Sequence, residues 1–230
     1  MDTLSCEELQ TRGVNQRLAS LTAPASVRVT HPGGRHNLAV GLTEAISISV
    51  EGNAGYFLGG LCGDGQGGGP EIVVNGFVGW SVGENLMGGQ IRVRGSASQS
   101  AGSSARGGLI VIEGDASLRA GISLKGGTVA IAGDAGAMSG FMAQAGTILI
   151  GGSAGHGLGD SLYEAIIYVG GTIASLGADA VIEEMTDDDV LAVKWLVEQT
   201  GFDHIEPDHL TKVTSARRLY HFSTHNHDTY

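Results

Sequence analysis

Pairs of β-branched residues, two positions apart, recur along the middle of the chain at a fixed interval. Over residues 71–184 the pairs return every 19 residues through six rows without a gap. They are Ile72/Val74, Ile91/Val93, Ile110/Ile112, Val129/Ile131, Ile148/Ile150 and Ile167/Val169. Residues two apart on a strand point to the same face, so each row is predicted to open with a short strand whose one side is buried.

A glycine follows each predicted strand and indicates a corner. These glycines are Gly76, Gly95, Gly114, Gly133, Gly152 and Gly171, and a second glycine stands seven positions later in five of the six rows. Glycine tolerates positive φ at a corner, and the chain has 39 glycines in 230 residues. Strands and corners repeated at fixed length predict a β-solenoid.

The repeats divide the chain into three regions. An imperfect row begins at Ser47 and runs into extra residues at QGGGP (66–70), so about seven coils are expected. We predict an all-β fold, a parallel β-helix over 47–184, with an N-terminal helix and lead-in over 1–46 and a capping helix plus tail over 185–230. The crossover rule for parallel strands favours right-handed winding.

Helix signals stand on both sides of the repeats. Ser5 with Glu8 fits a capping box for a helix within residues 1–20. Thr186 followed by three aspartates predicts the start of a second helix, and Gly201 predicts its end. Because the open end of a solenoid exposes unpaired strand edges, we expect this second helix to cover that end.

The segment after the second helix is rich in arginine, histidine and aromatic residues, unlike the rest of the chain. Aromatic residues and arginine are enriched at protein interfaces, which predicts a partner contact. The alternative is that the tail folds back along the solenoid, with its arginines facing acidic side chains. The candidate interface residues are Arg217, Arg218, Tyr220, His221, Phe222 and Tyr230.

Two motifs resemble ligand sites. Residues 63–68, GDGQGG, match the glycine pattern of a nucleotide-binding loop, but a strand follows where that fingerprint needs a helix, which favours a plain insertion loop. His221, His225 and His227 could form a metal cluster, but no cysteine or spaced fourth ligand accompanies them. We expect no metal or cofactor in this chain.

Three further residues are candidates for a catalytic role. Asp115 and Asp134 stand in one column of successive rows, as in a polysaccharide-cleaving β-helix, but their column carries no acidic stripe. They are simpler to interpret as turn residues. His156 lies in a glycine-rich corner without a nucleophile elbow, which also favours a turn residue.

Composition narrows the function classes. The net charge of −11 disfavours nucleic acid as a partner, because the surface would repel phosphates. No apolar run approaches the ~20 residues of a membrane-spanning helix. A polar N-terminus and two cysteines, too few for a typical iron–sulfur cluster, favour a cytoplasmic protein without disulfides.

The repeats also resemble a known family. The runs SISVEGNAGYFLGGLCGDGQ (47–66) and GFVGWSVGENLMGGQIRVRGSASQSAG (76–102) are similar to the Gly-x-Gly-x-Gly domain of the glutamate synthase large subunit. The GENLM segment, the LYHF tail and the length look more like the stand-alone β-helix subunit of N-methylglutamate synthase (methylamine–glutamate N-methyltransferase). The C subunit of formylmethanofuran dehydrogenase is a further relative.

The resemblance implies a right-handed β-helix without catalytic residues. It implies two partners, a glutaminase-like amidotransferase subunit and an FMN-binding glutamate-synthase-like subunit that also carries an iron–sulfur cluster. The chain lacks attached catalytic domains and has its own QGGGP insertion, in which it departs from the large subunit. One alternative is a subunit of another amidotransferase or of a formylmethanofuran-dehydrogenase-like complex. The other is an independent binding module or carbohydrate-active β-helix, which the expected lack of an acidic or aromatic stripe and of a secretory signal disfavours.

Overall fold

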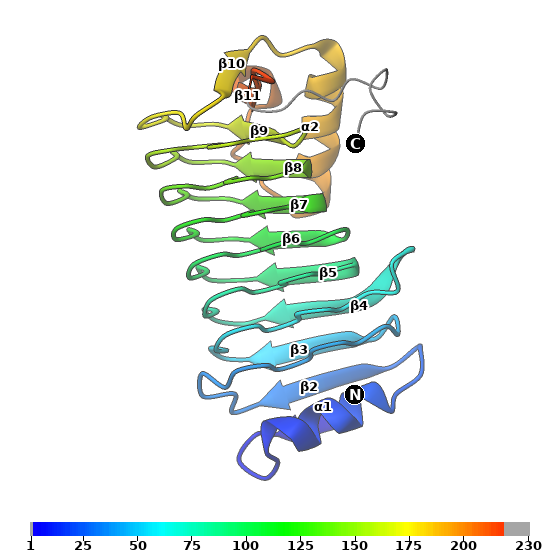
Figure 1. The fold of residues 1–230 in the computed structure, drawn as a ribbon. Helices are drawn as coiled ribbons and strands as arrows, with labels where there is room; N and C mark the ends of the chain where they lie inside the picture. Colours follow the sequence, from blue (N-terminus) through cyan, green and yellow to red (C-terminus); the bar gives the residue numbers. More distant parts are fainter. Residues whose placement is uncertain (1, 219–230) are drawn as a thin grey trace, which may run out of the picture.

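The computed structural model describes residues 2–218. This part of the chain winds into a solenoid whose coils are stacked along the long axis (Figure 1). Its strands form one 11-stranded sheet. In chain order the elements are β1 (Asp2–Ser5), α1 (Thr11–Ala19), β2 (Ser26–Thr30), β3 (Ser47–Glu51), β4 (Gly67–Val74), β5 (Gly88–Val93), β6 (Leu109–Ile112), β7 (Lys125–Ile131), β8 (Ala145–Ile150), β9 (Ile166–Val169), β10 (Ala180–Glu183), α2 (Asp187–Thr200), η1 (Pro207–His209) and β11 (Thr211–Ser215).

The strands from β2 to β9 pair in parallel, one from each coil, so the described residues contain eight coils. The all-β class and the right-handed β-helix are confirmed. The count of seven was too low, because β2 opens a further coil inside the predicted lead-in. Ser26 pairs with Ser47, and Ser47 with Glu71, so the first two coils are 21 and 24 residues long. A 19-residue period cannot find the first of them.

The interior of the solenoid is a set of stacked side-chain columns. The β-branched pairs of the parallel strands are all buried, at 2% exposure or less. Small residues fill the opposite wall, where Ala97, Ala116, Ala135 and Ala154 form isolated parallel bridges from coil to coil. Burying an isoleucine or valine is worth ~1.5–3 kcal/mol, so the strand columns supply most of the core energy.

The glycines after the strands are needed for close stacking, and the predicted reason was wrong. None of the six strand-end glycines (Gly76, Gly95, Gly114, Gly133, Gly152 and Gly171) has a positive φ. A Cβ at Gly152 would lie 2.8 Å from the carbonyl carbon and oxygen of Gly133, on the coil before it. These positions exclude a side chain because two backbones meet there.

Positive φ occurs at the second bend of each coil instead. The glycines of this bend, called corner glycines here, include Gly83, Gly102, Gly121 and Gly140, with φ between 65° and 72°. The residues two before and two after them also have positive φ although they are not glycine, as at Ser100 and Ser104. Every regular coil thus turns through alternate left-handed residues.

The N-terminal end is closed by a strand and a helix. The predicted capping box is wrong: Ser5 is the last residue of β1, its hydroxyl accepts the Glu7 N–H, and α1 begins only at Thr11. Val14 and Leu18 of α1 are buried against the first coil. The Asn15 side chain binds the Asn37 carbonyl and the Ala39 N–H, so it satisfies backbone groups that have no preceding coil.

Helix α2 has the predicted ends but a different place. Thr186 and Asp189 form a reciprocal capping box, and Gly201 ends the helix in the left-handed conformation. The prediction that this helix covers the open end of the solenoid is wrong. The helix lies along the outer face of the sheet beside several coils (Figure 1), where Val193 and Leu196 share a second core with outward residues of four strands. Those outward residues are Val111, Ala130, Leu149 and Tyr168.

The C-terminal end is closed by a strand that returns to the sheet. β11 pairs antiparallel with both β9 and β10, so it occupies the edge that another coil would take. β10 is then the edge strand of the sheet, and its length of four residues limits pairing with another chain. The part of the predicted tail up to Ser215 therefore folds onto the solenoid.

Candidate functional site

Three aromatic side chains from three successive coils stack on the outside of the solenoid, on the turns between the strands. The rings of His36 and Tyr56 are 4.3 Å apart with an angle of 25° between their planes, and those of Tyr56 and Trp80 are 5.1 Å apart at 14°. Tyr56 is 38% exposed and Trp80 47%. The His36 Nδ1 lies 2.8 Å from the Tyr56 backbone nitrogen, whose N–H it accepts, which fixes the first ring.

This stack corrects the expectation that the chain has no aromatic stripe. Its members stand 20 and 24 residues apart: His36 and Tyr56 lie in the two coils that depart from the 19-residue period, and Trp80 lies in the regular coil after them. Aligning the coils by their strands puts Tyr56 and Trp80 in one column and His36 one position away from it. The stack is therefore a surface feature that a fixed-period reading conceals.

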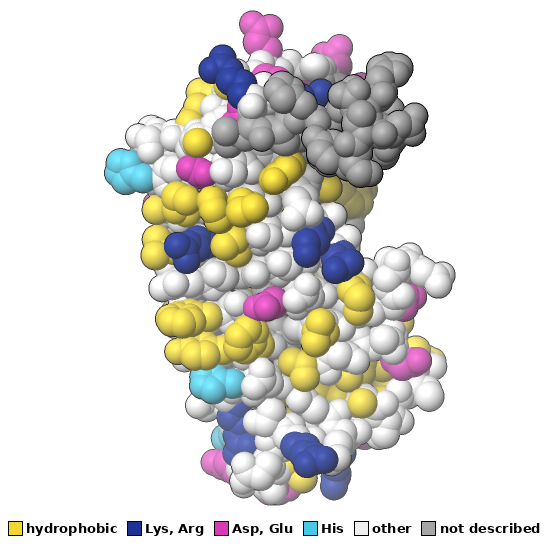
Figure 2. All heavy atoms as spheres, in the orientation of Figure 1, with side chains coloured by type: hydrophobic (Ala, Val, Ile, Leu, Met, Phe, Trp, Pro, Cys, Tyr) yellow, Lys and Arg dark blue, Asp and Glu magenta, His cyan; other side chains and the backbone are white. Residues whose placement is uncertain are grey.

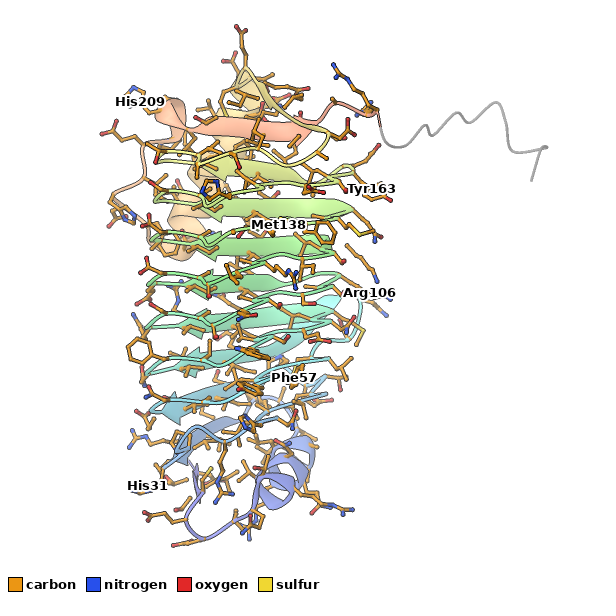
Figure 3. All side chains as sticks on the ribbon, turned by 60° about the vertical axis from the view of Figure 1, so that its left-hand side comes forward. His31, Phe57, Arg106, Met138, Tyr163 and His209 are labelled. Atoms are coloured by element: carbon orange, nitrogen blue, oxygen red, sulfur yellow. The ribbon has the colours of Figure 1, made fainter. Side chains whose placement is uncertain are left out.

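Exposed apolar side chains extend the stack into two groups. Figure 2 shows hydrophobic atoms gathered in two areas on one side of the molecule, separated by a band of other atoms. Phe57 and Leu61 are 40% and 56% exposed beside the stack. Leu118 and Met142, farther along the solenoid, are 43% and 37% exposed. Phe57 and Met138 both lie on the face that Figure 3 turns forward.

Asp115 and Asp134 belong to a ladder of hydrogen bonds between coils. The Asp115 carboxylate accepts the Asp134 N–H at 2.9 Å, and the Asp134 carboxylate accepts the Ser153 N–H at 2.6 Å. Asn53, Ser96 and Ser153 act in the same way toward the next coil. The two aspartates thus hold backbone amides, which agrees with the interpretation as turn residues.

The glycine-rich loop at residues 63–68 closes on itself. Asp64 Oδ1 accepts the backbone N–H groups of Gln66 and Gly68, and the Asp64 N–H donates to the Gly68 carbonyl. β4 begins within the motif, at Gly67, in place of the helix that a nucleotide-binding loop needs. The amides that a phosphate would need are in part already satisfied by Asp64, so the structure agrees with a plain insertion loop.

The remaining predicted residues do not converge on one site. His156 Nδ1 lies 3.3 Å from the Ser175 hydroxyl of the next coil, and that oxygen also accepts the Gly157 N–H. The backbone N–H of Arg218 donates to the Asp179 carboxylate. Tyr220, His221, Phe222, His225, His227 and Tyr230 lie outside the described residues. Within residues 2–218, no group of three or more His, Cys, Asp or Glu side chains could hold a metal ion.

A buried charged network fixes α2 and β11 to the sheet. Asp189 accepts hydrogen bonds from the Tyr168 hydroxyl at 2.6 Å and from Lys212 Nζ at 2.8 Å. Burial opposes ionisation of Asp189, but the hydrogen bonds from Lys212, Thr186 and Tyr168 outweigh it and lower its pKa. Burial and the neighbouring carboxylate raise the pKa of Tyr168. The network is fully partnered and structural.

The two cysteines are also structural in their surroundings. Both are free and buried. The Cys62 thiol donates to the Ala39 carbonyl, and burial raises its pKa to about 11. A thiol that stays protonated near neutral pH is a poor nucleophile and a poor metal ligand.

A cavity of about 530 Å³ opens at the C-terminal end, between β10 and β11 and the last coil. Its lining is mostly polar and includes Glu164, Glu183, Lys212 and Arg217. Lys212 is already bound to Asp189, and Glu183 lies 3.9 Å from the same ammonium group.

No helix in the described part of the chain has the length and apolar character needed to span a bilayer.

Comparison with known proteins now identifies relatives of this solenoid. No family model matches the chain. Protein GlxC of Rhizobium meliloti (strain 1021) is 47% identical over 205 residues, which cover 89% of this chain and 88% of that protein. The chain belongs to the GlxC family. The aligned 205 residues include the coils of the solenoid, so the likeness extends over the repeats.

Membership in the GlxC family does not indicate what the site binds or which reaction it supports. The relative's name states no substrate, cofactor or partner. On the described surface of this GlxC-family chain, the aromatic stack and the exposed apolar groups around it are typical of a binding surface.

Proposed function

We propose that this chain is a non-catalytic β-helix subunit of a glutamate-synthase-like complex, and that the complex is N-methylglutamate synthase. In this role it braces a glutaminase-like amidotransferase subunit and an FMN-binding glutamate-synthase-like subunit, and FMN and an iron–sulfur cluster reside in the latter. Support comes from the resemblance of residues 47–66 and 76–102 to the Gly-x-Gly-x-Gly domain, and from membership in the GlxC family.

The observation that carries the proposal is the exposed aromatic stack on a rigid frame. His36, Tyr56 and Trp80 project from three coils whose backbones are hydrogen-bonded to each other. A partner that docks there meets side chains already held in place, so little conformational entropy is lost on binding. A scaffold subunit needs such a pre-organised contact surface.

The test is purification of the native complex through a tag on this chain. Mass spectrometry should identify the glutaminase-like and FMN-binding subunits in fixed ratio, and the eluate should show a flavin spectrum. The purified complex should form N-methylglutamate from glutamate and methylamine. A chain that elutes alone from its native source, without flavin, contradicts the proposal. A complex that uses a different amine acceptor would keep the scaffold role and reject N-methylglutamate synthase.

A second candidate, an independent carbohydrate-binding module, is favoured by the same exposed aromatic residues. The geometry argues against Tyr56 as the sugar-binding ring, because both of its faces are covered, by His36 on one side and Trp80 on the other, which leaves Trp80 as the ring to test. Sugar rings stack on an open aromatic face. Retention of the purified chain on immobilised polysaccharides, lost in Trp80→Ala, would favour this second function.

A further inference from the structure

The two apolar groups on the outer face are separated by one coil of small polar residues. The lower cluster consists of Tyr56, Phe57, Leu61 and Trp80, and the upper cluster of Leu118, Met138, Phe141 and Met142. Between them the coil from Ser96 to Ser104 carries mainly serine, alanine and glycine. Its neighbours are fixed by backbone bonds: the Ser81 N–H donates to the Gln99 carbonyl and the Ser100 N–H to the Leu118 carbonyl.

Apart from Gln99, the side chains of this serine coil are smaller than those of the two clusters on either side of it. Coils are ~4.8 Å apart, so the centres of the two clusters lie about three coils, or roughly 14 Å, from each other. This arrangement suits a partner segment that contacts both clusters and crosses the serine coil between them. We call the lower cluster, the serine coil and the upper cluster together the two-cluster face.

Three cations border this face without acidic partners. Arg106, Arg119 and Lys125 are exposed, and no ion pair joins any of them to an acidic side chain of residues 2–218. Figure 3 shows Arg106 beside the face that carries Phe57 and Met138. The chain has 24 acidic residues and 13 Lys and Arg, so a cluster of free cations runs against its overall charge.

The position of these cations is unfavourable for the isolated chain. The Lys125 N–H donates to the Ala105 carbonyl, so Lys125 lies on the coil directly after Arg106 and at the same place in the repeat. Two like charges at the same place on neighbouring coils repel each other. Arg119 lies on the same coil as Leu118, and its N–H donates to Ala137 beside Met138, which brings a third positive charge into the upper cluster.

We infer that the two-cluster face is the docking surface for an acidic segment of a partner subunit that has apolar side chains in two groups. Apolar contacts on the two clusters would supply affinity, and carboxylates opposite Arg106, Arg119 and Lys125 would set the register and speed association. This inference rests on the proposed function for the existence of a partner. It adds which surface that partner uses and what chemistry it must present.

The experiment is a titration of the full-length chain against the purified FMN-binding subunit, and separately against the glutaminase-like subunit. Tyr56→Ser with Trp80→Ser tests the lower cluster, and Arg106→Glu with Lys125→Glu tests the charges. Each double variant should weaken binding of the same subunit by about tenfold or more. The affinity of the unaltered chain should fall as salt rises, and less steeply for the charge-reversed variant.

The matched control removes exposed apolar residues from another face. Leu191 and Trp195 of α2 are 63% and 56% exposed, so Leu191→Ser with Trp195→Ser removes as much apolar surface without touching the two-cluster face. Binding should stay within about twofold of the unaltered chain in this variant. Circular dichroism and urea unfolding of every variant check that the solenoid is intact.

The outcomes separate the two proposals. If the unaltered chain binds neither subunit, the proposed function fails and the docking proposal fails with it. If it binds but Arg106→Glu with Lys125→Glu has no effect, or if only the α2 control weakens binding, the scaffold role stands and the two-cluster face is overturned. A chain that dimerises by sedimentation, with the dimer lost in Tyr56→Ser with Trp80→Ser, would make a second copy the occupant and also overturn it.

Discussion

The two glycine positions of each coil look alike in the sequence and differ in what they require. A strand-end glycine such as Gly152 has an ordinary φ, and its missing Cβ makes room for the backbone of the neighbouring coil. A corner glycine such as Gly121 has a φ of 68°, and its missing Cβ makes room for a core side chain, Ile148. One position is limited by backbone contact and the other by conformation and side-chain packing.

The difference predicts which substitutions can be rescued. Backbone atoms of two hydrogen-bonded coils cannot separate without loss of the ladder, whereas a core side chain can be shortened. The largest effect is therefore expected at a strand-end glycine, and a smaller, recoverable effect at a corner glycine.

Gly152→Ala should destabilise the chain by ~3 kcal/mol, at the upper end of the range for overpacking, because the new Cβ meets backbone. Its nearest contacts are Asp134 Oδ1 at 2.3 Å and the Gly133 carbonyl carbon and oxygen at 2.8 Å. Adding Asp134→Ala removes only the carboxylate, so it should not restore stability. Urea unfolding followed by circular dichroism measures both variants, and recovery in the double variant would contradict backbone contact as the cause.

Gly121→Ala should cost ~2 kcal/mol, from left-handed strain and from overlap with the core. The new Cβ would lie 2.4 Å from Ile148 Cδ1, an atom that Ile148→Val removes. Ile148→Val alone should cost ~0.5–1.5 kcal/mol, and the double variant should be more stable than the sum of the two changes predicts. If the stability loss of the double variant equals the sum of the two single losses, the corner glycine is required for its φ alone.

The sequence predicted the strands and the places of both glycine columns because each coil repeats the same contacts. It could not distinguish their roles, since φ and the distance between coils are set by stacking. The first coil was missed because residues 26–46 have their own length. The site of α2 did leave a signal: Val111, Ala130, Leu149 and Tyr168 point outward yet are apolar, which indicates that something covers them.

The surface was harder to predict than the core for a related reason. The stack of His36, Tyr56 and Trp80 depends on the register of two irregular coils, which the strand pairing fixes and the 19-residue period does not. Asp115 and Asp134 were interpreted as turn residues, and their carboxylates accept backbone N–H groups of the next coil. Their role between coils follows only from stacking.

The aspartate ladder next to the strand-end glycines offers a smaller test. Asp134→Ala removes the acceptor of the Ser153 N–H at an exposed position, and should cost about 1 kcal/mol. Asp134→Asn keeps a side-chain oxygen there and should recover most of the loss. Equal stability of the two variants, measured by urea unfolding, would mean that the carboxylate charge and not the hydrogen bond stabilises the bend.

The smallest effect should have the opposite sign and lies beside a corner glycine. Ser100 has a φ of 61°, a conformation that costs a non-glycine residue roughly 1–2 kcal/mol. Ser100→Gly removes this strain, but the greater entropy of the unfolded chain lowers stability by ~0.5–1 kcal/mol. A net gain in stability of about a few tenths to 1 kcal/mol is therefore expected.

Ser98→Gly is the matched control, because Ser98 lies on the same coil without a positive φ and gains no relief. It should lose ~0.5–1 kcal/mol from unfolded-state entropy alone. The comparison is made between the urea midpoints of the two variants. If Ser100→Gly loses as much stability as Ser98→Gly, left-handed residues are not strained in this corner, and the corner glycines would then be selected by the space that their neighbours leave.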